Sequence, residues 1–128
     1  MKPLTKKAAK KAIRWYRKRM RLRDWGIAVE VHDDPPKWWE NIDSYTYAAV
    51  KTAVQDHGAR IWVSNARCLA KRVCPLAALF HECEHVRGAR DGTEDHSVDC
   101  ATPLHKEFSN NCVGAVLAAL YRKEKRNA

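Results

Sequence analysis

The 128-residue sequence has no long apolar segment and no regular arrangement of cysteines. Its longest C-terminal apolar run, residues 115–120, is far too short to cross a bilayer, and no apolar stretch of signal-peptide length follows the positive N-terminus. The five cysteines are odd in number and include no CxxC pair, so they do not predict a disulfide framework. We therefore expect a soluble intracellular protein of the cytoplasm with reduced thiols.

Acidic residues are absent from the first 23 positions, which hold 11 of the 24 lysines and arginines. The middle of the chain, residues 24–121, is acidic, with nine lysines and arginines against 14 aspartates and glutamates. Basic residues return in a short tail, residues 122–128. A chain of this length fits one domain, so we expect a basic N-terminal segment (1–23), a core (24–121) and a basic tail within a single unit.

Hydrophobic periodicity predicts one helix and three strands in the first half of the chain. Apolar residues recur at helical spacing within residues 3–22, with lysine and arginine on the other faces, which predicts a basic amphipathic helix. Alternating apolar residues predict strands at 27–31 and 59–63. The β-branched and aromatic residues of 45–54 predict a third strand, joined to the last by a hairpin turn at 55–58.

Two prolines mark the predicted starts of later helices. Pro75 suits the first turn of a helix that runs through Val86, and Gly88 is placed to end it. Pro103 would open a last helix. The apolar face of that helix is predicted from residues spaced four apart: Phe108, Cys112, Val116 and Leu120. The resulting fold is α+β, with an N-terminal helix, a small, mostly antiparallel or mixed sheet of about three strands, a central helix and a C-terminal helix.

The segment HECEH, residues 81–85, lies within the predicted central helix. His81 and His85 are four residues apart, so their imidazoles project from one face and can reach a single metal ion. Glu82 lies about 100° around the helix from His81, where its carboxylate can reach a metal-held water without ligating the metal. Zinc would lower the pKa of that water towards ~7 and polarise a peptide carbonyl, with Glu82 as general base. Cys83 falls nearly opposite and is expected to be a buried small hydrophobe.

The longer segment HECEHVRGARD, residues 81–91, reads HExxHxxGxxD. It resembles the elongated motif of the metzincin clan of zinc peptidases, in the variant where Asp replaces the third His, as in snapalysin-type peptidases. The resemblance implies a single zincin-like domain whose catalytic core is residues 24–121. It also implies that Gly88 turns the chain sharply, that Asp91 is the third zinc ligand, and that the strand at 45–54 binds an extended peptide by strand addition.

Metzincins have a methionine turn after the motif, whereas the only methionines here are Met1 and Met20. The chain is also similar to small zincin-like proteins of phages and bacteria, which would place a phage-encoded protein in the host cytoplasm. The third ligand then stays open. His96 is the main alternative to Asp91, because imidazole is a favoured zinc ligand and Gly92 makes the loop before it flexible. The remaining candidates are Glu94, Asp99 and Glu107.

The basic N-terminal helix predicts a second kind of contact. Its cations suit nucleic-acid phosphates, an acidic partner or an anionic membrane surface, and we favour nucleic acid without sequence-specific readout. The residues assigned to this contact are Lys6, Lys10, Arg14, Arg17 and Arg21. Two functions follow from the sequence. One is a Zn2+-dependent peptidase acting on a peptide or protein. The alternative is a non-catalytic nucleic-acid-binding protein in which HECEH holds a structural metal or none.

Overall fold

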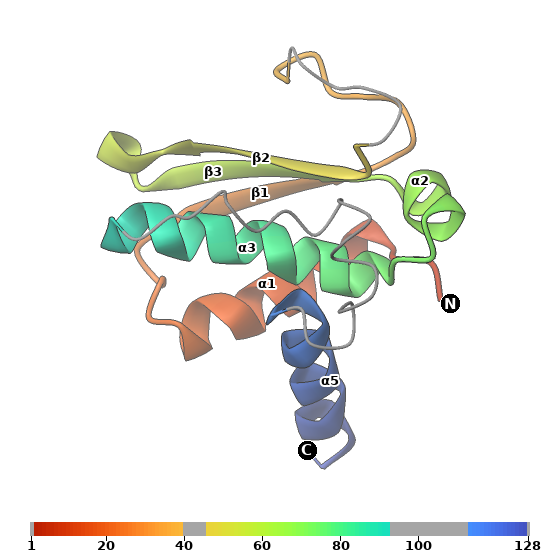
Figure 1. Cartoon of the computed structure of the whole chain (residues 1–128). Coiled ribbons are helices and arrows are strands. Elements are labelled where there is room, and N and C mark those ends of the chain that lie inside the picture. The colour runs from red at the N-terminus through yellow and green to blue at the C-terminus, as the bar shows by residue number, and fades with distance from the viewer. Residues whose placement is uncertain (1, 40–45, 93–112, 128) are drawn as a thin grey trace.

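The computed structural model describes residues 2–39, 46–92 and 113–127. It confirms the α+β fold: a small sheet lies on one side, helices α1 and α3 run beneath it, and α5 extends away from α3 (Figure 1). The elements are α1 (Lys6–Arg19), β1 (Gly26–Val31), β2 (Ala48–Ala53), a 3-10 turn η1 (Val54–Asp56), β3 (Gly58–Val63), α2 (Asn65–Ala70), α3 (Pro75–Asp91) and α5 (Val113–Arg126). No helix within these described ranges is both long and apolar enough to cross a membrane.

The sheet is mixed, with strand order β1-β3-β2. Strand β1 runs parallel to β3, and β2 runs antiparallel to β3 through the turn that ends at His57, whose φ is 47°. The register aligns Val29, Ile61 and Val50 across the three strands, on the face that joins the main core. Helices α1 and α3 cover this face.

Helix α1 is the basic amphipathic helix that the sequence predicts. Its N-terminus is capped by Thr5, whose hydroxyl accepts a hydrogen bond from the Ala8 amide at 3.0 Å. Its buried face consists of Ala9, Ala12, Ile13 and Tyr16. Arginine and lysine occupy the last turn, where positive charge is stabilised by the helix dipole.

Helix α3 begins at Pro75 as predicted, but its end lies further along the chain. The prediction that Gly88 ends the helix is wrong, because Gly88 is buried inside α3, which continues to Asp91. The left-handed residue that terminates it is Gly92, with φ of 70°. The short helix α2 was not predicted. Ser64 caps it by accepting a hydrogen bond from the Arg67 amide at 3.1 Å.

Helix α5 continues to Arg126, so most of the predicted basic tail is helical. The predicted apolar face of this helix is partly wrong: Val116 is 53% exposed, whereas Leu117 and Ala118 are buried. Pro103, Phe108 and Cys112, on which the rest of that prediction depends, lie outside the described residues. The buried side packs on α3 through Gly114, where an added Cβ would overlap the carbonyl oxygen of Ala77.

Candidate metal centre

The two histidines of HECEH lie one turn apart on α3, and their rings converge. The Nε2 atoms of His81 and His85 are 3.2 Å apart, and the rings are nearly perpendicular, at 87°. On a tetrahedral zinc ion with Zn–N bonds of about 2.0–2.1 Å, two ligand nitrogens are about 3.3–3.4 Å apart. The separation therefore fits two ligands of one ion. It also permits a direct hydrogen bond in which one ring N–H donates to the other ring nitrogen.

The packing of α3 explains why this pair lies at the margin of the core. Leu79, Phe80 and Val86 are fully buried and fix the rotation of the helix against the sheet and its neighbours. His81 and His85 then lie at the margin of the core, where both are partly exposed. A metal at this margin would be held by a rigid element and still be reachable by a substrate.

Glu82 is buried, at 7% exposed. Its carboxylate lies close enough to the buried thiol of Cys68 to influence it electrostatically. The pKa of Cys68 is raised to about 12, first by burial, then by Cys74 and by Glu82. Burial likewise raises the pKa of Cys83 well above its usual value, with Glu82 and Glu84 adding to the effect. Both thiols therefore stay protonated at neutral pH, and Cys83 is the buried small residue that the sequence predicts.

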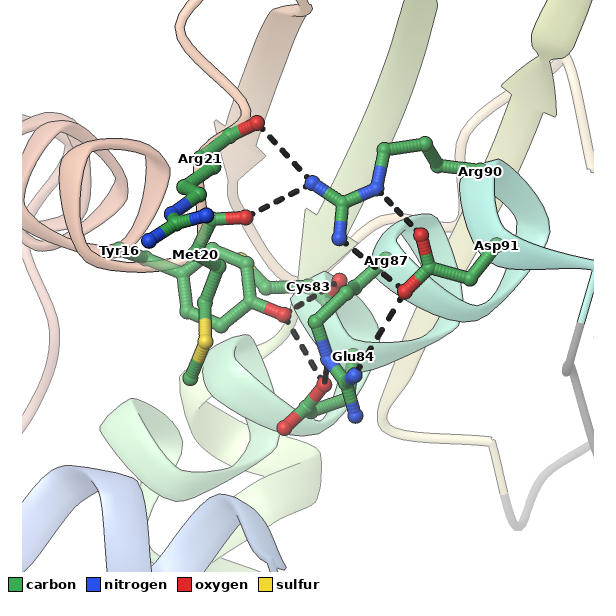
Figure 2. A network of polar contacts seen from close by, with 8 residues as sticks. All are labelled: Tyr16, Met20, Arg21, Cys83, Glu84, Arg87, Arg90 and Asp91. Carbon is green, nitrogen blue, oxygen red and sulfur yellow. Dashed lines mark hydrogen bonds and ion pairs between the residues drawn. The ribbon is translucent and has the colours of Figure 1, made fainter.

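Glu84, the charged residue inside the motif, faces helix α1 (Figure 2). Its Oε2 accepts a hydrogen bond from the Tyr16 hydroxyl at 3.0 Å and one from Arg87. The same hydroxyl lies 3.1 Å from the Cys83 carbonyl oxygen. Burial raises the pKa of Tyr16, and the Glu84 carboxylate raises it further, so the hydroxyl remains a donor. Glu84 thus anchors α3 to α1.

Asp91 belongs to the same network. Both of its carboxylate oxygens bind Arg90, at 2.7 and 3.0 Å, and Arg87 lies 3.7 Å from one of them. The hydrogen bond from Arg90 lowers the pKa of Asp91. Because α3 continues through Gly88, Asp91 lies about 9 Å further along the helix axis than His85. The structure therefore does not bring Asp91 to the histidine pair.

The third ligand stays a prediction. Within the described ranges, no group of three or more His, Cys, Asp or Glu residues is placed to hold a metal ion. His96, Glu94, Asp99 and Glu107 lie outside the described residues. The structure thus supplies two converging nitrogens from α3.

Strand β2 packs against the helix that carries the two histidines. It lies at the edge of the sheet, paired with β3 on one side, and it contacts α3. This is the strand to which the metzincin resemblance assigns the bound peptide. An edge strand presents backbone N–H and C=O groups that an extended peptide can pair with.

The predicted nucleic-acid contacts divide into two groups. Lys6, Lys10 and Arg14 are exposed along one side of α1. Arg17 instead donates to the carbonyl oxygens of Leu22 and Arg23, at 3.2 and 2.6 Å, and so closes the turn after the helix. Arg21 lies beyond the end of α1 at a φ of 57°, and its carbonyl oxygen accepts from Arg90 at 3.0 Å (Figure 2).

The structural roles of three residues of this region were missed from the sequence. Tyr16 could have been identified because the hydroxyl of a buried tyrosine needs a hydrogen-bond partner. Glu84 could have been identified because Glu84 and Arg87 have the i, i+3 spacing of a helical ion pair. Gly114 carried a weaker signal, since a glycine within a helical pattern indicates close backbone packing.

Comparison of the chain with protein-family models, with curated proteins and with solved structures finds no significant match in any of the three.

Proposed function

We propose that this chain is a zinc-dependent metallopeptidase. The observation that carries the proposal is the convergence of the His81 and His85 Nε2 atoms at 3.2 Å, close to the spacing of two ligands on one tetrahedral zinc ion. Glu82 follows His81 directly, on the same rigid helix. Two imidazoles and an adjacent carboxylate are groups that metal-assisted peptide hydrolysis uses, together with a third metal ligand.

His81 and His85 would hold the ion, and Glu82 would move the proton. Bound zinc would supply a Lewis acid that polarises the peptide carbonyl and makes a water molecule more acidic. Glu82 takes the proton of the attacking water and passes it to the leaving amine. The substrate peptide would pair with β2, the edge strand of the described sheet on this side.

The observed end of α3 bears on the choice of third ligand. For Asp91 to reach the ion, it would have to leave Arg90 and Arg87, and the last turn of α3 would have to unwind at Gly88. A ligand beyond Gly92 avoids this cost. We therefore favour His96 over Asp91, and zinc stoichiometry of His96→Ala and Asp91→Ala separates them.

The decisive experiment compares two glutamates of the same motif. Glu82→Gln should retain zinc and thermal stability but lose peptide hydrolysis by about 10²-fold or more, since general-base catalysis contributes roughly 10²–10⁴. Glu84→Gln is the matched control, because it removes the same charge from a carboxylate that faces Tyr16. It should retain hydrolysis.

The outcomes are distinct for the competing functions. Wild-type protein that binds no zinc would overturn the proposal. Wild-type protein that binds zinc but cleaves nothing in a broad peptide library would favour the non-catalytic alternative, with a structural metal on the histidines. Equal activity of the Glu82 and Glu84 variants would remove Glu82 from the mechanism.

A further inference from the structure

Exposed basic residues lie on α1 and on the last turns of α5, and the two helices touch. The exposed residues of α1 are mostly cations: Lys6, Lys7, Lys10, Lys11, Arg14, Lys18 and Arg19. No acidic residue lies on this helix. Lys6, Lys10, Arg14 and Lys18 repeat at spacings of four, so they follow one side of the helix as a row.

Contacts at the end of α1 join it to α5. Arg19 binds Glu124 at 2.6 Å, and the Trp15 indole N–H donates to the other carboxylate oxygen at 2.5 Å. Glu124 is the single acid on α5, and its charge is balanced by Arg19. The residues around it in the same turn are exposed cations: Lys123, Lys125 and Arg126. The two contacts therefore bring the cations of the last turns of α5 next to the C-terminal end of α1.

The burial of apolar and aromatic residues and the exposed positive charge indicate which kind of partner this surface binds. A helix that inserts into a membrane needs a free apolar face, whereas Ala9, Ala12 and Tyr16 are fully buried in the core. Binding of single strands by stacking needs exposed aromatic rings. Trp15 instead packs against Phe80 and Tyr121, at ring separations of 5.5 and 5.2 Å. What remains is closely spaced positive charge, which suits the phosphates of a duplex.

We propose that the basic surface of α1 and α5 binds the phosphodiester backbone of duplex nucleic acid without reading its sequence. The α1 part of this surface lies on the side of α3 that Tyr16 and Glu84 mark. On a helical wheel Arg87, which also faces α1, lies about 140° around α3 from the histidine pair. Duplex binding at this surface does not require peptidase activity.

The test uses full-length protein, a short labelled DNA duplex and three charge-reversal pairs of equal size. Lys10→Glu/Arg14→Glu alters α1, and Lys123→Glu/Arg126→Glu alters α5. Lys51→Glu/Arg60→Glu is the control, because these exposed residues are cross-strand neighbours on the sheet, away from both helices. Binding is measured by fluorescence anisotropy across a salt series, with circular dichroism to verify folding.

The α1 and α5 variants should each bind at least about tenfold more weakly, with a salt slope reduced by about two, and the control should bind like wild type. Equal weakening by all three pairs would mean that only net charge matters and would overturn the site. An α5 variant that binds like wild type would overturn the two-helix surface. Wild-type protein that binds phosphatidylserine vesicles but no duplex would replace nucleic acid with a membrane.

Discussion

Helix α3 presents two contrasting polar sides. On the side facing α1, charges of opposite sign balance one another: Glu84 and Asp91 bind Arg87 and Arg90, and Tyr16 completes the network (Figure 2). On the other side two like groups, His81 and His85, point their nitrogens at one point. The first arrangement stabilises a fold, because each charge is offset by a neighbour. The second suits an ion between the two rings.

The largest expected effect separates metal binding by the histidine side of α3 from stabilisation of the fold by the side that faces α1. His85→Ala should lower zinc affinity by more than about 100-fold, because even changes to groups that only support a ligand commonly cost 10- to 100-fold. Arg87→Ala, two residues later on the α1 side, should leave zinc affinity unchanged. Isothermal titration with zinc measures both. Equal losses in the two variants would show that the sides are not separate.

The next effect concerns the packing of α5 against α3 beside His81. Gly114→Ala places a methyl group against the carbonyl of Ala77 and within 3.1 Å of the His81 backbone nitrogen. Helix α5 must then shift, at a cost of about 1–3 kcal/mol, and zinc affinity should fall with it. Gly26→Ala is the control, since nothing lies within 4 Å of a Cβ there. Denaturant unfolding and zinc titration report the two changes; an unaffected Gly114 variant would contradict the close packing.

The smallest effect concerns the α1 side alone. Tyr16→Phe removes the hydroxyl that binds Glu84 and leaves the ring in the core, so the free energy of unfolding should fall by about 1–2 kcal/mol. Zinc affinity should stay at the wild-type value. Urea denaturation checks the stability and titration checks the metal. A Tyr16→Phe protein with weakened zinc binding would mean that the network also positions the histidines.

Much of the fold was predictable because periodicity reports which face of an element is buried. It predicted α1 and the three strands, while the preference of proline for the first turn of a helix predicted the start of α3 at Pro75. The four-residue spacing of His81 and His85 predicted their shared face. Each of these depends on residues close in sequence.

What the sequence did not predict depends on tertiary packing. Both Gly88 and Gly92 suit a helix end, and burial of Gly88 inside α3 decides for Gly92. Val116 fits a four-residue repeat, but the approach of Gly114 to α3 turns that face outward. The parallel pairing of β1 with β3 is not visible in the alternation of either strand, because both directions give the same period.

The strand order also has a consequence for how the chain assembles. Strands β2 and β3 form a hairpin that closes a short loop. Strand β1 pairs with β3 in the sheet, although β2 lies between them in the sequence. Local hairpins form within about 1–10 μs, and non-local parallel pairing is slower because more chain entropy is lost beforehand. Helix α3 packs on β2 and β3. We therefore expect the hairpin and the helix with the histidines to associate first, and β1 with the basic helix α1 to join them later.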